Sequence, residues 1–148
     1  MGMYFEEFNV GKKIVTGNRT VTSDDIMKFA ELTGDNNRIH TDAEFSKTTP
    51  FGQRVAHGLL GLSLASGLAW QTGILDGTVI AFREVTEWKF TKPIFINDQV
   101  HADLSITETK ALPRIGGGSV VLEVELKNQK DEALMKGSWN ILVLSKPK

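Results

Sequence analysis

The sequence predicts a single α+β domain over residues 1–148, with an antiparallel sheet wrapped around one long central helix. First, 148 residues with 41% hydrophobic content suit one domain with an ordinary core. Second, segment 58–72 carries no charged residue and presents leucine or alanine on almost every helical face. Third, the chain beyond it is a succession of segments rich in β-branched and aromatic residues, which is typical of strands.

The segment before the apolar helix is predicted to hold a strand and two helices. Thr22 or Ser23 can cap a helix whose apolar residues recur at helical spacing, and Gly34 is a typical helix stop. The expected elements are a strand over 13–21, a helix ending before Gly34, a loop lasting to about Thr41, and a short helix over 42–47.

The apolar segment 58–72 is expected to be a helix that is buried nearly all round. Gly58, Gly61 and Gly67 each cost helix stability, so we expect another backbone to approach them closely. Polar residues interrupt this run of about fifteen residues, which is too short to span a bilayer.

The rest of the chain is predicted to be mostly strand. Residues 128–132 form a natural hairpin connection, and 114–118 precede a strand, so they are expected to be a flexible turn and not a phosphate loop. A sheet curled around one helix leaves exposed edges, which a partner subunit commonly covers. The predicted strands are 78–82, 85–90, 100–110, 119–128 and 133–144.

Composition excludes several classes of function. The 17 basic and 18 acidic residues are intermingled, with no basic stripe to suggest nucleic-acid binding. Cysteine is absent, which excludes disulfides, thiolate metal sites and a cysteine nucleophile. The N-terminus has early acidic residues and no signal-peptide pattern, so we expect a soluble, cytoplasmic protein with no membrane span.

The candidate site begins with Asp35 and His40, a carboxylate and an imidazole five residues apart in a polar, turn-prone segment. Together they can move protons to and from one bound water. Taken alone, such a pair is more often structural. The segment Ala56-His57-Gly58, however, opens the apolar helix, whose first N–H groups can hold negative charge on a carbonyl oxygen. The combination predicts an enzyme acting on a carbonyl-activated substrate.

Residues 29–42, FAELTGDNNRIHTD, and 55–60, VAHGLL, resemble the MaoC-like hydratases and dehydratases, whose best-known members are R-specific enoyl-CoA hydratases. The resemblance covers nearly the whole chain, because the order of helix and strands also fits. It implies one MaoC-like hot-dog domain, usually a homodimer or a higher even oligomer with joined sheets. It implies no cofactor, since coenzyme A is part of the substrate.

The resemblance also implies roles for five residues. Asp35 and His40 are similar to the catalytic acid/base pair, and Gly58 to the backbone donor to the thioester oxygen. The supporting residues are Asn37, which helps to place the water or a catalytic side chain, and Ser66, which steadies the site by hydrogen bonding. One departure is Arg38, where members often have proline; it frees the loop backbone and brings a charge near the site mouth.

The other histidines have weaker claims. His57 is expected mainly to cap or pack at the helix start, with a direct role in the site as the alternative, and His101 to lie on the sheet surface. A metal site from His40, Asp42 and His57 matches no known ligand spacing, so no metal is predicted.

The predicted function is reversible hydration of a trans-2-enoyl-CoA thioester, and the resemblance implies the (3R)-hydroxyacyl product. One of Asp35 and His40 takes a proton from water and the other delivers one to C2; the sequence does not assign the two parts. A hot-dog thioesterase is an alternative, although it usually needs a carboxylate on the central helix, and 58–72 has none. A half-active or non-catalytic subunit of a heterodimeric acyl-carrier-protein dehydratase is another, opposed by the intact pair.

Overall fold

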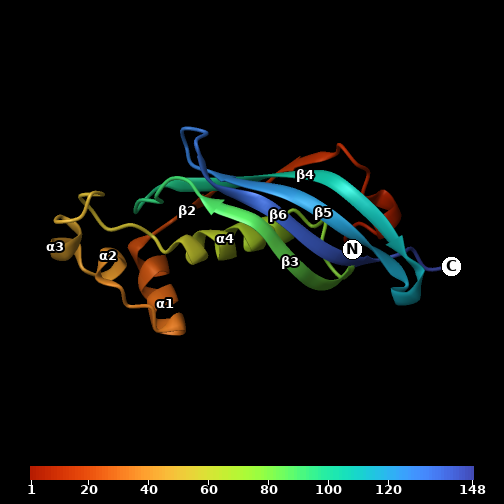
Figure 1. The fold of residues 1–148 in the computed structure, drawn as a ribbon, viewed down its shortest axis with the longest axis horizontal. Coiled ribbons are helices and arrows are strands. Elements are labelled where there is room, and N and C mark those ends of the chain that lie inside the picture. Colours follow the sequence, from red (N-terminus) through yellow and green to blue (C-terminus); the bar gives the residue numbers. More distant parts are fainter.

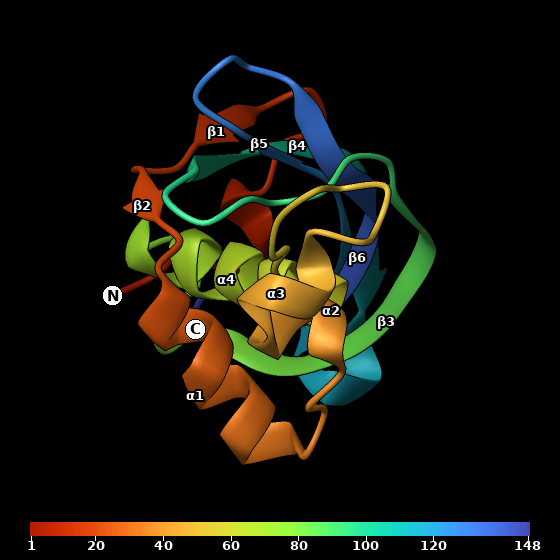
Figure 2. The same ribbon diagram turned by 90° about the vertical axis from the view of Figure 1, so that its left-hand side faces the viewer.

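The structure is a computed structural model that describes all 148 residues. Six antiparallel strands form one sheet in the order β1-β4-β5-β6-β3, with β2 paired to β4. The sheet lies along one side of α4 (Gly58–Gln71) in Figure 1, and Figure 2 shows the strands curving around that helix. The predicted antiparallel sheet around one central helix is therefore confirmed. The strands are β1 Lys13–Val15, β2 Arg19–Thr20, β3 Val79–Phe90, β4 Gln99–Leu112, β5 Gly117–Lys127 and β6 Ala133–Leu144.

Three helices lie beyond one end of the sheet, near the start of α4 (Figure 1). Thr22 caps α1 as predicted, because its Oγ1 accepts a hydrogen bond from the Asp25 N–H at 3.1 Å. Gly34 ends α1 in the left-handed conformation, with φ of 79°. The helices are α1 Ser23–Thr33, α2 Arg38–Thr41 and α3 Ala43–Ser46, and two 3₁₀ turns, η1 Phe5–Glu7 and η2 Pro113–Ile115, complete the secondary structure.

The hydrophobic core lies between α4 and the concave face of the sheet. Inward-facing residues alternate along β4 and β5, which confirms the alternation expected in these segments. From α4, Leu60, Ala65, Leu68 and Ala69 pack into the same cluster. The buried side chains of the two central strands are Val100, Ala102, Leu104, Ile106, Val120, Leu122, Val124 and Leu126.

Three elements differ from prediction by more than two residues. The strand expected over 13–21 breaks into β1 and β2, because the Ala102 N–H donates to the side-chain Oγ1 of Thr16 at 2.8 Å. The two strands expected over 78–90 form one bent strand, β3, whose register shifts around Glu87 at φ 52°. The loop expected to last until Thr41 ends earlier, because the Asn37 side chain caps a short helix, α2, that begins at residue 38.

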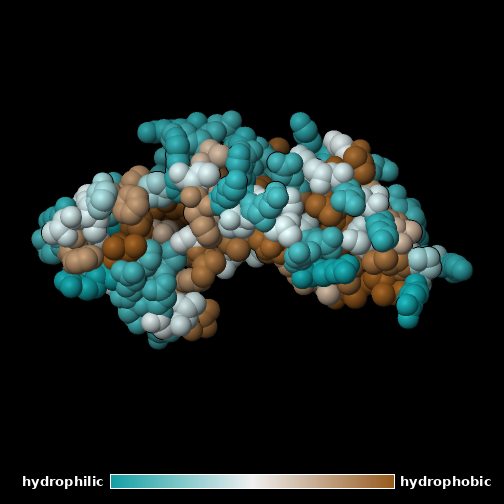
Figure 3. Space-filling view, in the orientation of Figure 1, coloured by the Kyte–Doolittle hydropathy of each residue, from teal (hydrophilic) through white to brown (hydrophobic).

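One face of α4 is not buried, contrary to expectation. Leu59 is 60% exposed and Trp70 57% exposed, and Ser63 and Ser66 lie exposed between them at helical spacing. The edge strand β3 also exposes large apolar side chains; these are Ile80, Phe82, Val85 and Phe90. In Figure 3, hydrophobic side chains gather along the hollowed lower margin, below α4 and β3. No part of the chain covers this face.

None of the helices combines the length and the hydropathy that crossing a membrane requires.

Gly137→Ala is expected to destabilise the fold by about 1–3 kcal/mol, as overpacking of a core typically does. A Cβ on Gly137 in β6 would lie 2.9 Å from the Trp88 Cα and 3.0 Å from the Thr86 carbonyl oxygen, both backbone atoms of β3. Urea denaturation measures the loss. In the single chain, a Cβ on Gly67 would meet nothing within 4 Å, so Gly67→Ala is the control. Equal stability of the two variants would contradict the prediction.

Candidate active site

The loop between α1 and α2 is built by hydrogen bonds between its own residues. The Asp35 Oδ1 accepts from the Asn37 N–H at 3.2 Å, and the Asn37 Oδ1 accepts from the Ile39 N–H at 3.2 Å. Asn37 therefore caps α2 with its side chain. This interaction presents Asp35 at the exposed end of the loop and starts the short helix that carries His40.

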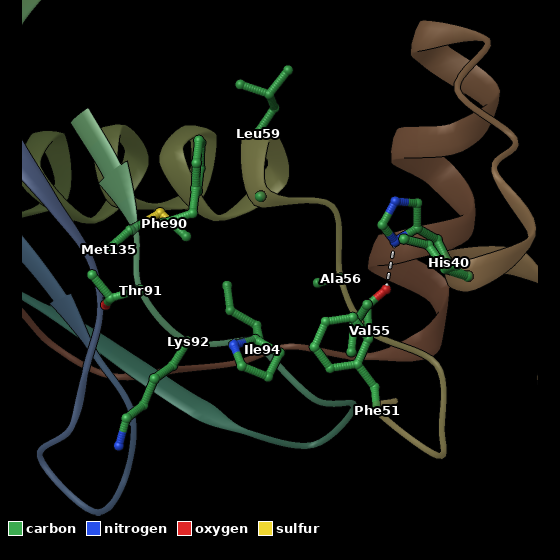
Figure 4. Close-up of a pocket in the computed structure, with 13 residues that line it drawn as sticks. His40, Phe51, Val55, Ala56, Leu59, Phe90, Thr91, Lys92, Ile94 and Met135 are labelled. Carbon is green, nitrogen blue, oxygen red and sulfur yellow. Dashed lines mark hydrogen bonds between the residues drawn. The ribbon is translucent and has the colours of Figure 1, made fainter. Parts of the chain in front are cut away.

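His40 is held in one tautomer by a backbone hydrogen bond. Its Nδ1–H donates to the Val55 carbonyl oxygen at 2.7 Å (Figure 4), and because a carbonyl can only accept, Nδ1 carries the hydrogen. Burial lowers the pKa of His40 below its usual value of 6.5; the Val55 hydrogen bond and the charge of Asp35 oppose this shift, while His57 adds to it. The imidazole is thus neutral at pH 7, and its Nε2 lone pair is available to accept a proton.

His57 brings Asp35 and His40 together. Its ring stacks on the His40 ring, with centroids 3.9 Å apart and planes at 28°, and its other neighbour is Phe29 of α1 at 4.9 Å. Its Nε2–H donates to the Asp35 carbonyl oxygen at 2.9 Å. It makes no side-chain capping bond to α4. One polar side-chain atom from each of Asp35, His40 and His57 lies within 4.8 Å of the others, so folding assembles the predicted pair.

The geometry does not favour a metal ion among these residues. Asp42 does not join them, because its Oδ1 accepts from the Phe45 N–H at 3.0 Å and caps α3. The lone pairs of His40 and His57 lie in their ring planes, and stacked planes at 28° do not converge on an ion at about 2.0–2.1 Å from both nitrogens. The arrangement suits proton transfer instead.

A cavity of about 450 Å³ opens beside His40. His40 lies at one end of it, and Thr91 and Lys92 lie at the other (Figure 4). The first residue of α4, Gly58, also lines the cavity. The walls between are largely apolar and include Phe51, Phe90, Ile94 and Met135. The cavity can hold an apolar or extended ligand with a polar group near His40.

Gly58 contributes a free backbone donor. No hydrogen bond engages its N–H, because the first N–H groups of a helix have no partner within it. The fourteen residues of α4 add their partial positive charge at this end. A Cβ on Gly58 would lie 2.8 Å from two atoms of the Phe90 ring, so only glycine lets that ring form the cavity wall.

Asp35 and Asn37 do not line the cavity, and the other predicted residues also lie away from it in the single chain. Ser66 is on the exposed face of α4, where its Oγ donates to the Ser63 carbonyl oxygen at 2.7 Å. Arg38, expected near the site mouth, lies over the Phe45 ring at 4.2 Å and near Asp42, and it does not line the cavity. His101 lies on the sheet at 3.5 Å from the Asp131 carboxylate, as expected of a surface residue.

Arg54 was not predicted as a site residue. Its Nε–H donates to the His40 carbonyl oxygen at 2.6 Å, and its Nη1 donates to the Ser23 Oγ at 2.8 Å. It therefore ties the α2 helix to the start of α1. The carbonyl of Val55 was missed too, because every residue carries a backbone carbonyl and the sequence does not single one out.

A sheet wrapped around one long helix defines the hot-dog class of proteins, and solved structures of this class superpose on the chain. Residues 7–128 match the family model described as MaoC like domain, so the chain belongs to the MaoC-like dehydratase family.

Three relatives illustrate this membership. The chain is 34% identical over 106 residues to 3-hydroxybutyryl-CoA dehydratase from Methylorubrum extorquens, covering 72% of the chain but only 65% of that relative. It is 31% identical over 105 residues to (R)-specific enoyl-CoA hydratase from Aeromonas caviae, covering 71% of the chain and 75% of that protein. A solved structure of a monoamine oxidase regulatory protein from Archaeoglobus fulgidus is 37% identical, with a TM-score of 0.91 over 99% of the chain and 97% of its own.

Proposed function

We propose that the protein catalyses reversible hydration of trans-2-enoyl-CoA thioesters to (3R)-3-hydroxyacyl-CoA. The observation that carries the proposal is that neutral His40 and the free N–H of Gly58 line one apolar cavity, with the Asp35 carboxylate beside His40. Membership of a family that hydrates or dehydrates acyl thioesters supports the reaction type. The name of the Aeromonas caviae relative supports the R product.

The chemistry follows from the tautomer of His40. As the water oxygen bonds to C3, the π electrons move toward the thioester carbonyl, whose oxygen gains negative charge. The Gly58 N–H and the start of α4 stabilise that oxygen. His40 Nε2 accepts the proton that leaves the water, and the resulting imidazolium returns a proton to C2. Asp35 accepts the second hydrogen bond of the water, and its charge stabilises the imidazolium. Atoms and charge balance without a further reactant.

The acid limb of kcat/KM for hydration is expected to have its midpoint below pH 6.5, because burial lowers the pKa of His40 and the neutral form is the base. Asp35 raises that pKa, so Asp35→Asn should lower it further. The pH dependence of kcat/KM gives the midpoint of the acid limb in wild type. An NMR titration of the His40 Hε1 signal compares the His40 pKa in wild type and in Asp35→Asn, and it does not depend on activity. A midpoint above pH 6.5, or a higher pKa in Asp35→Asn, would contradict the assignment.

The protein is expected to be a homodimer with an apparent mass about twice 16.3 kDa, or a higher even multiple. β3 ends the sheet with twelve residues and an unpaired edge, and its exposed apolar side chains adjoin those of α4. Phe90 and Leu59 belong to this surface and also line the cavity, so a second copy paired along β3 would help to close the site. Light scattering measures the mass. A fully active monomer would exclude this assembly.

Crotonyl-CoA provides the direct test, with enoyl absorbance and free thiol followed separately. Loss of absorbance without thiol release, with the (3R) product found by chiral analysis, is the expected result. Release of thiol would instead indicate a thioesterase, which the absence of any carboxylate on α4 opposes. A crotonyl carrier-protein ester in a parallel assay distinguishes the two carriers. If neither ester reacts, the result contradicts the proposed hydration of this acyl group and favours the non-catalytic subunit.

A further inference from the structure

His57 contacts both members of the acid/base pair without reaching the cavity. It is 2% exposed and is not among the residues that line the cavity, so it does not touch a ligand bound there. Its ring nevertheless stacks on His40, and its Nε2–H is bonded to the carbonyl of Asp35. The mechanism above gives this residue no proton to carry.

We propose that His57 is a positioning residue, which fixes the backbone of Asp35 and the ring plane of His40 so that both groups reach the same water. This inference rests on the hydration proposed above. It assigns His57 a part in turnover that differs both from direct catalysis and from ordinary packing at the start of a helix.

The hydrogen bonds of Asp35 show why the loop needs this support. Asp35 is exposed, and its other hydrogen bonds are local, from its own N–H to the Thr33 Oγ1 and from the Asn37 N–H to its Oδ1, each 3.2 Å long. The bond from His57, 22 residues along the chain, is the only one that ties Asp35 to the start of α4. Without it, Asp35 itself keeps only the hydrogen bonds to Thr33 and Asn37.

The orientation of the His40 ring also depends on His57. The hydrogen bond from Nδ1 to the Val55 carbonyl fixes one atom but leaves rotation about that contact. The face of His57, at a centroid separation of 3.9 Å, restricts that rotation, and His57 in turn contacts the Phe29 ring at 4.9 Å. The direction of the His40 Nε2 lone pair therefore depends on the stack. Small misplacements of this kind reduce turnover strongly, because proton transfer needs aligned groups.

The remaining nitrogen of His57 argues against a role in packing alone. Nδ1 is buried and has no hydrogen-bond partner, an arrangement that costs stability. An apolar ring would fill the same space without this cost. Only the Nε2–H donor distinguishes histidine from such a ring, and that donor serves Asp35.

Three substitutions at His57 test the proposal through the steady-state kinetics of crotonyl-CoA hydration. His57→Gln can place an amide N–H near the position of Nε2, whereas the shorter His57→Asn cannot reach it. His57→Phe keeps the stacked face and loses the donor. We expect His57→Asn to lower kcat about tenfold, the equivalent of one net hydrogen bond, with KM unchanged because the residue does not line the cavity. His57→Gln should recover part of the loss. Circular dichroism confirms that each variant is folded.

An NMR measurement separates failure of this inference from failure of the proposed function. The His40 Hε1 signal senses the ring stacked on it, so the ring-current shift should be lost in His57→Asn and should persist in His57→Phe, whose phenyl ring also stacks. If wild type does not hydrate crotonyl-CoA, the function fails, and an unshifted His40 signal in His57→Asn would independently overturn the positioning role. With an active wild type, wild-type kcat in His57→Asn, no advantage of Gln over Asn, or a change confined to KM would each overturn it.

Discussion

Asp35→Asn and His40→Ala are each expected to lower kcat for hydration by about 10²–10⁴, the usual contribution of a general acid or base. His40 offers its free Nε2 lone pair to the water, and Asp35 lies close enough to bind the same water and stabilise the imidazolium. Neither change removes a large apolar side chain from the core. The double variant should lose little beyond either single one, because the two residues act as a unit.

The controls remove the same chemical groups elsewhere. Asp24→Asn takes away an exposed carboxylate of α1 that pairs with Lys28, and His101→Ala removes the imidazole on the sheet surface. Both should keep wild-type kcat and KM. Steady-state kinetics with crotonyl-CoA and circular dichroism are measured for the five variants and for wild type. Near wild-type turnover in either Asp35→Asn or His40→Ala would show that the site is wrongly assigned.

Gly58→Val is expected to reduce kcat/KM by about 10² or more, the loss typical of removing an oxyanion donor. The N–H remains in this variant, but the new side chain must displace the Phe90 ring, which lies 2.8 Å from the position of the added Cβ. The displaced ring and the valine methyl groups enter the cavity that His40 lines, so the thioester oxygen cannot approach the donor. Compared with this loss, the tenfold effect expected for His57→Asn is small.

Gly67→Ala is the matched control for this prediction. It adds a methyl group to the same helix at a position where no atom of the chain lies within 4 Å of the new Cβ. Light scattering confirms that the variant assembles as wild type does. Full activity in Gly67→Ala and strong loss in Gly58→Val would place the effect at the helix start. If Gly58→Val stayed active while His57→Asn was inactive, the imidazole of His57 would be the catalytic group.

The main elements of the fold could be predicted because each depends on local pattern. Alternating apolar residues define β4 and β5, and the Thr22 cap and Gly34 stop define α1. One error came where a contact distant in sequence decided the boundary. β1 ends at Val15 because the side-chain Oγ1 of Thr16 accepts a hydrogen bond from the Ala102 N–H, 86 residues away. The exposed face of α4 was missed because hydropathy alone does not tell a buried apolar face from one left uncovered by the chain.

The sequence by itself determined the candidate chemistry: a carboxylate and an imidazole five residues apart, and a glycine at the start of an apolar helix. Only the tertiary structure decided how those groups are presented. The tautomer of His40 depends on the Val55 carbonyl, and the position of Asp35 depends on a bond from His57. Both acceptors are backbone oxygens that every residue type carries, and folding alone brings them to the imidazoles from 15 and 22 residues away.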